Sequence, residues 1–109
     1  MVAVLAMPGV ARGAMARDVF LYDSRFSPSR LAAEEAGAAQ VVDVATVDPA
    51  QLWRDQITRR FAESVGCIEG LTAGSDYMIA SLFARDQRFY PVSDPVPEGV
   101  LLRWRLVRR

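Results

Sequence analysis

The side chains that could do chemistry gather in three short polar segments, each of which follows an apolar run. Residues 23–25 (Asp-Ser-Arg) follow "VFLY", Asp43 and Thr46 lie at the end of "QVVDVAT", and residues 70–75 ("GLTAGS") follow "CIE". In an open α/β sheet the carboxyl ends of parallel strands meet at one edge, where helix N-termini present free N–H groups. The pattern predicts a site for a small anion at that edge. Its expected residues are Asp23, Ser24, Arg25, Gly70, Thr72 and Ser75.

The same residues also fit a purely structural role. Thr72 is a plausible helix N-cap, Gly70 a turn residue, and Asp76 a carboxylate in the first helical turn, where the helix dipole favours it. Asp76 would partly neutralise the site against an anion, and Asp23 could simply pair with Arg25. The sequence leaves capping and ligand binding open as alternatives.

Missing residue types exclude several kinds of catalysis. The chain has no histidine, no lysine and no asparagine, and its one cysteine is Cys67. Catalytic triads with histidine, a Schiff-base lysine and a phosphate-binding Gly-Lys-Ser loop therefore cannot be built within it. Cys67 near a predicted helix start could have a lowered pKa, but a lone cysteine in "VGCIEG" is more typical of the core. Glu34 and Glu35 are consecutive and predict a solvated face. We expect no metal and no cofactor, and the missing residue types lean against an enzyme without deciding the question.

Length and charge limit the class to which the protein can belong. A chain of 109 residues with 51% hydrophobic and 24% charged residues fits one compact domain, which we place at residues 17–109. The formal net charge is zero because thirteen acidic residues balance thirteen basic ones. The basic cluster Arg103, Arg105, Arg108 and Arg109 is diluted by those acids, so we expect neither a nucleic acid nor a membrane as partner.

Alternating strand-like and helix-like segments predict the fold class α/β. We expect a single small three-layer sandwich with a mainly parallel four- or five-stranded sheet and an antiparallel last strand. Expected strands cover residues 18–23, 40–45, 65–70, 88–93 and 100–109, and expected helices cover residues 27–38, 48–64 and 72–86. Ser27 and Asp48 are the expected N-caps, each followed by a proline, and Gly37 is an expected stop.

Three apolar patterns predict which side chains are buried. They are Trp53, Ile57 and Phe61 at spacing four, Met78, Ile79, Leu82 and Phe83 on one helical face, and Leu102, Trp104 and Leu106 in alternation. Trp104, Leu106 and the apolar start of the chain together exceed what a small protein usually exposes. We therefore expect a homo-oligomer.

Residues 1–16 form an apolar N-terminal segment with two interpretations. Ala14-Met15-Ala16 has the small-x-small pattern at which export signals are cleaved, whereas residues 2–7 could instead form a real strand. An ordered segment of this kind would pack on a sheet edge or on a neighbouring chain.

A resemblance bears on this choice. "LYDSRF", the "LW" of "DPAQLWRD", "IEGLT" and the "RD" before "RFYP" together resemble a group of small uncharacterised proteobacterial proteins with a twin-arginine export signal. The similarity covers roughly residues 18–92. It implies that residues 1–16 are a remnant of an export signal and that the protein is periplasmic, and it implies no activity. If Met1 is the true start, the expected location is the cytoplasm.

These observations favour a non-enzymatic binding or assembly module, with a small anion at the "GLTAGS" segment as its candidate ligand. The alternative is a small enzyme that uses Asp23, Arg25, Thr72 and Ser75 with an added metal or a partner protein. A binder or enzyme should have a concave pocket at the strand ends, whereas an assembly module should have that space filled by side chains.

Overall fold

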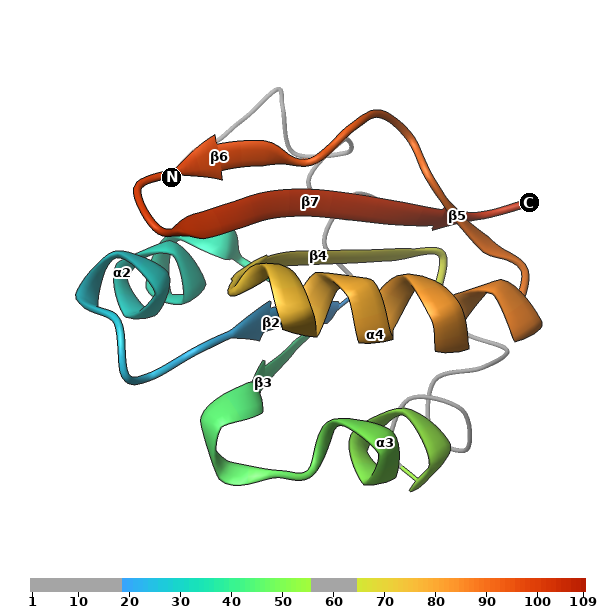
Figure 1. Ribbon diagram of the computed structural model, residues 1–109, viewed down its shortest axis with the longest axis horizontal. Coiled ribbons are helices and arrows are strands. Elements are labelled where there is room, and N and C mark those ends of the chain that lie inside the picture. Colours follow the sequence, from blue (N-terminus) through green and yellow to red (C-terminus); the bar gives the residue numbers. More distant parts are fainter. Residues whose placement is uncertain (1–18, 56–64) are drawn as a thin grey trace.

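A computed structural model of the protein describes residues 19–55 and 65–109 (Figure 1). The elements, in chain order, are β2 (Val19–Tyr22), α2 (Ser27–Ala36), β3 (Gln40–Asp43), the 3-10 helix η1 (Val44–Thr46), α3 (Pro49–Gln51), β4 (Cys67–Thr72), α4 (Gly74–Asp86), β5 (Phe89–Pro91), β6 (Val96–Glu98) and β7 (Leu101–Arg108). The predicted export segment at residues 1–16 lies outside the described residues, and so do Ile57 and Phe61 of the predicted apolar stripe.

The strands form one mixed sheet in the order β3-β2-β4-β7-β5, with β6 also paired to β7 (Figure 1). β2 is parallel to β3 and β4, whereas β7 is antiparallel to β4, β5 and β6. The expected antiparallel pairing of the last strand with the edge strand β5 is confirmed. The expectation of a mainly parallel sheet with four or five strands was wrong, because the described residues form a six-stranded mixed sheet.

The additional strand is β6, in a segment that the prolines of "DPVPEG" made us interpret as a link. Pro97 is tolerated because β6 pairs only with β7 in the described sheet, and an edge strand can spare an N–H group. Gly99, with a φ of 64°, makes the short turn that leads from β6 into β7.

Apolar side chains fill both faces of the sheet, and helices cover both. On one face, core residues from β2, β4 and β7 pack with α4 and with the segment after α3, as Val19, Leu21, Ile68, Trp104 and Leu106 do with Leu52, Trp53, Ala80 and Ala84. On the other face, Phe20, Leu71 and Leu101 pack against Ala32, Ala33 and Ala36 of α2.

The burial of Trp104 and Leu106 removes two of the side chains on which the expected self-association rested. Trp104 is 4% exposed and Leu106 is fully buried, so these side chains belong to the core and contribute nothing to an outer surface. On α4, Ile79 and Phe83 pack on the core, but Met78 and Leu82 do not. The prediction that all four share a buried face was wrong, because Ala80 and Ala84 form the line of α4 nearest the sheet.

The helix caps follow the sequence signals only in part. Gly37 ends α2 in the left-handed conformation with a φ of 66°, as predicted. Asp48 caps α3, because its Oδ2 accepts a hydrogen bond from the Gln51 N–H at 3.0 Å. Ser27 is not the N-cap of α2. Phe26 takes that position, without a side-chain cap, because its N–H is already held by the Asp23 carbonyl at 3.0 Å and fixes the chain entry one residue earlier.

Candidate functional site

The carboxyl ends of β2, β3 and β4 lie at one edge of the sheet, as the sequence predicted. The register pairs Tyr22 with Asp43 across one side of β2 and with Leu71 across the other. Because these strands are parallel, the polar residues that follow each strand meet at this edge. We call Asp23, Ser24, Arg25, Asp43 and Asp76 the strand-end cluster.

Asp23 is the centre of the strand-end cluster and is fully buried. Arg25 holds it with a forked contact: Nε donates to Oδ1 at 2.9 Å and Nη2 donates to Oδ2 at 2.6 Å. The Arg25 N–H also donates to Oδ1 at 3.1 Å. These bonds favour the charged carboxylate, so the hydrogen bonds from Arg25 hold the pKa of Asp23 below its ordinary value.

Ser29 ties the strand-end cluster to the sheet. Its Oγ accepts a hydrogen bond from the Asp23 N–H at 2.8 Å and donates one to the Leu71 carbonyl at 2.6 Å. Ser29 is fully buried, so it satisfies one backbone group on β4 and one just after β2 where water does not reach. Sequence reasoning missed this residue, and the only signal was a serine among the apolar positions of α2.

Asp43 fixes the turn after β3 to the turn after β2. Its Oδ1 accepts hydrogen bonds from the Ser24 N–H at 3.1 Å and from the Ala45 N–H at 3.0 Å. Burial acts to raise the pKa of Asp43, but the hydrogen bonds from Ser24 and Ala45 outweigh it, and the pKa lies below its ordinary value. Thr46 donates to the Asp43 carbonyl at 3.0 Å, so both groups serve this turn.

Asp76, in the first turn of α4, is the third carboxylate of the cluster. Burial raises the pKa of Asp76, and the charge of Asp23 raises it further, against the opposing charge of Arg25. Three carboxylates thus share one guanidinium. This excess of negative charge opposes the binding of an anion, as the sequence indicated for Asp76.

The "GLTAGS" segment is not a turn. Gly70, Leu71 and Thr72 are the last residues of β4, and α4 starts at Gly74 with Ala73 as N-cap and no side-chain cap. Thr72 therefore does not cap α4. It is fully buried, its Oγ1 accepts from Trp104 Nε1 at 3.0 Å, and it donates to the Ala73 carbonyl at 3.1 Å.

Gly70 is explained by the tryptophan that covers it. A Cβ at this position would lie 2.3 Å from Trp104 Cζ2 and 2.5 Å from Cε2. Only a residue without a side chain lets the indole lie so close to β4, and this replaces the predicted turn role. Of the predicted site residues, the structure therefore brings Asp23, Ser24 and Arg25 together, places Gly70 and Thr72 under Trp104, and leaves Ser75 exposed at the start of α4.

Cys67 lies at the amino end of β4, away from the α4 N-terminus, so the proximity considered for its pKa is absent. It is 2% exposed, and Arg105 Nε donates to its Sγ at 3.4 Å. This placement agrees with the core interpretation.

The terminal arginines have partners within the chain. Arg103 pairs with Glu98, and Arg105 lies 3.9 Å from Glu69. Arg108 donates to the carbonyls of Val65 and Gln87 at 3.1 and 2.8 Å. These contacts give the cluster a structural role.

Two further features were sought among the described residues, a metal site and a membrane-spanning helix. Among them, no group of three histidine, cysteine, aspartate or glutamate side chains is placed to hold a metal ion. No helix within residues 19–55 and 65–109 has the length and apolar character needed to cross a bilayer. In comparisons with protein-family models, curated proteins and solved structures, the chain has no match.

Proposed function

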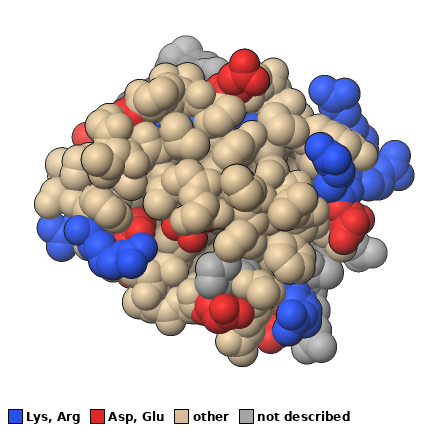
Figure 2. All heavy atoms as spheres, in the orientation of Figure 1, with Lys and Arg blue, Asp and Glu red and all other residues tan. Residues whose placement is uncertain are grey.

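We propose that this protein is a non-enzymatic assembly module that forms a dimer through the outer side of α4. One observation carries the proposal: Met78 is 63% exposed and Leu82 is 65% exposed, one helical turn apart. No charged residue occurs on α4 between Asp76 and Arg85. Figure 2, in the orientation that has α4 in front, shows a largely uncharged surface with most charged side chains toward its margins.

A second copy of the chain is the occupant that best fits this surface. Ser75, Met78, Leu82 and Arg85, here called the α4 face, follow one another at spacings of three, four and three and are symmetric about Ala80. An antiparallel two-fold pair would place Met78 against the partner's Leu82. It would also place Arg85 against the partner's Ser75 at both ends of the contact.

The expected affinity is low, which decides how the proposal must be tested. Burying a Met or Leu side chain fully contributes about 1.5–3 kcal/mol, and here four partly exposed side chains would be covered. Association itself costs about 4–15 kcal/mol in lost freedom of motion. A weak dimer is therefore expected, with a Kd on the order of micromolar to millimolar.

Sedimentation equilibrium over a wide concentration range tests the proposal. We expect wild type to approach the dimer mass with increasing concentration and Leu82→Glu to stay monomeric, because a carboxylate in the apolar seam is not compensated. Leu31→Glu is the matched control, since Leu31 is 57% exposed on α2 and the substitution is the same. A wild-type protein that stays monomeric up to about 1 mM, or equal loss in both variants, would refute the proposal.

Binding of a small anion and catalysis by a small enzyme are the competing candidates. The raised pKa of Asp76 beside Asp23 and Arg25 favours chemistry at the strand ends, since such shifts gather at functional sites. Against an anion stands the forked pairing of Arg25 with Asp23, which the anion would have to displace. Thr72 is fully buried with its hydroxyl engaged, so it cannot contact a ligand without rearrangement.

Thermal denaturation with small anions and divalent metals separates these candidates from assembly. A ligand at a hundred times its Kd should stabilise wild type by about 2.7 kcal/mol. An increase in Tm that is lost in Arg25→Ala would favour a strand-end binding site. An unchanged Tm with every compound would leave the assembly module as the better explanation.

A further inference from the structure

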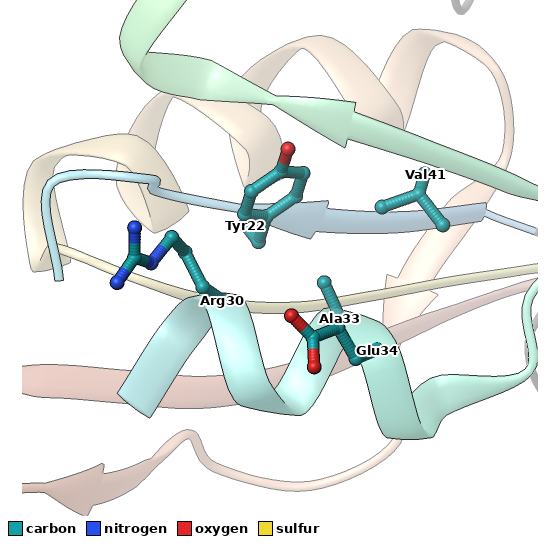
Figure 3. A pocket seen from close by; sticks show the side chains of 5 residues that line it. All are labelled: Tyr22, Arg30, Ala33, Glu34 and Val41. Atoms are coloured by element: carbon teal, nitrogen blue, oxygen red, sulfur yellow. The ribbon is translucent and has the colours of Figure 1, made fainter. Parts of the chain in front are cut away.

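A hollow of about 310 Å³ lies beside the edge strand β3, on the face of the sheet opposite α4. It is lined by Tyr22, Arg30, Ala33, Glu34 and Val41 (Figure 3). The hollow exists because α2 packs over β2, β4 and β7 and leaves β3 uncovered. Val41 is 46% exposed as a result.

The walls of this hollow combine an aromatic ring and small apolar side chains with two opposite charges. Figure 3 shows the Tyr22 ring between the Arg30 guanidinium and Val41, with the Glu34 carboxylate facing the same space from α2. Arg30 and Glu34 are both exposed, and within the described residues neither side chain makes a hydrogen bond or an ion pair. Arg30 and Glu34 are four residues apart on α2, so their backbone positions are about 6 Å apart along the helix axis, and within the described residues their opposite charges are not paired.

We propose that this hollow binds a small zwitterion with an apolar side chain, which is the chemistry of a free aliphatic or aromatic α-amino acid. The ligand's ammonium group would contact the Glu34 carboxylate and the face of the Tyr22 ring. Its carboxylate would take the paired N–H groups of Arg30. Its apolar side chain would cover Ala33 and Val41.

Size and charge both support this class of ligand. A volume of about 310 Å³ is at the small end of ligand pockets, which fits an occupant of amino-acid size. A ligand with a single charge would satisfy one of the two side chains and leave the other unpaired. The site lies across the sheet from the α4 face, so this inference is independent of the proposed dimer.

Titration followed by ¹H–¹⁵N NMR tests the inference with defined probes. L-Leucine should shift the amide signals of Tyr22, Ala33 and Val41. Isopentylamine, which lacks the carboxylate, and 4-methylpentanoate, which lacks the ammonium group, should each bind about tenfold more weakly. N-Acetyl-leucinamide, which has neither charge and imitates an extended peptide, should bind most weakly of all.

Variants of the full-length chain identify the contacts. Glu34→Gln and Arg30→Gln are surface substitutions, and each should weaken leucine binding about tenfold. Glu35→Gln is the matched control, because the neighbouring Glu35 lines a different hollow with Glu69 and Arg103 and should leave leucine binding unchanged. Absence of leucine shifts at about 50 mM, equal binding of N-acetyl-leucinamide, or equal losses in Glu34→Gln and Glu35→Gln would overturn the inference.

Discussion

Replacement of Gly70 by alanine is the sharpest test of how the sheet core is built. The added Cβ would lie 2.3 Å from Trp104 Cζ2, well inside any contact that real side chains make. Trp104 must therefore move, and its Nε1 then loses the hydrogen bond of 3.0 Å to Thr72 Oγ1. The indole would also lose its contact with the Tyr77 ring, whose centroid lies 5.7 Å away.

The size of the effect follows from the overpacking and from the lost hydrogen bond. Overpacking a core costs about 1–3 kcal/mol, and a buried polar group left without its partner costs about 1–3 kcal/mol. Gly70→Ala should therefore reduce the free energy of unfolding by about 2–6 kcal/mol, which is a large part of the total of about 5–15 kcal/mol for a protein of this size. Urea denaturation followed by tryptophan fluorescence measures this loss directly.

Gly74→Ala supplies the matched control for this prediction. A Cβ at Gly74 would meet only Leu102 Cδ1 at 3.6 Å, an ordinary contact distance. Alanine also favours helix over glycine, so this variant should be neutral or stabilised by up to about 1 kcal/mol. A Gly70→Ala variant as stable as wild type would refute the reasoning. The same conclusion would follow if its cost were unchanged in a Trp104→Phe background, because phenylalanine lacks the Cζ2 and Cη2 atoms that the Cβ meets.

Three further predictions concern the strand-end cluster. Ser29→Ala should reduce the free energy of unfolding by about 2–4 kcal/mol in urea, because the Asp23 N–H and the Leu71 carbonyl both lose a buried partner. Arg25→Ala should destabilise the protein at neutral pH but not below the folded-state pKa of Asp23. That pKa is lowered, so the ion pair stabilises the fold fully above the unfolded-state pKa of Asp23, and the stabilisation is lost on acidification. Measurement of Tm against pH checks this. Asp76→Asn should raise Tm at pH 7 and leave it unchanged near pH 3, because the pKa of Asp76 is raised and its ionised form costs stability above that pKa.

Local signals were sufficient for elements whose ends are decided by neighbouring residues. The run "VFLY" is β2, with its first three side chains buried, and Gly37 ends α2 where the sequence placed the stop. The meeting of Asp23 and Asp43 at one edge also followed from the sequence, because it required only that β2 and β3 be parallel.

Features that depend on pairing between distant segments could not be predicted. The role of Gly70 becomes visible only when the register places it opposite Trp104. Thr72 fits a helix cap by every local criterion, yet its hydroxyl is taken by the same tryptophan, 32 residues further along the chain. Pro95 and Pro97 made the segment of β6 look like a link between strands. The sequence does not show that this strand lies at an edge, where proline is tolerated.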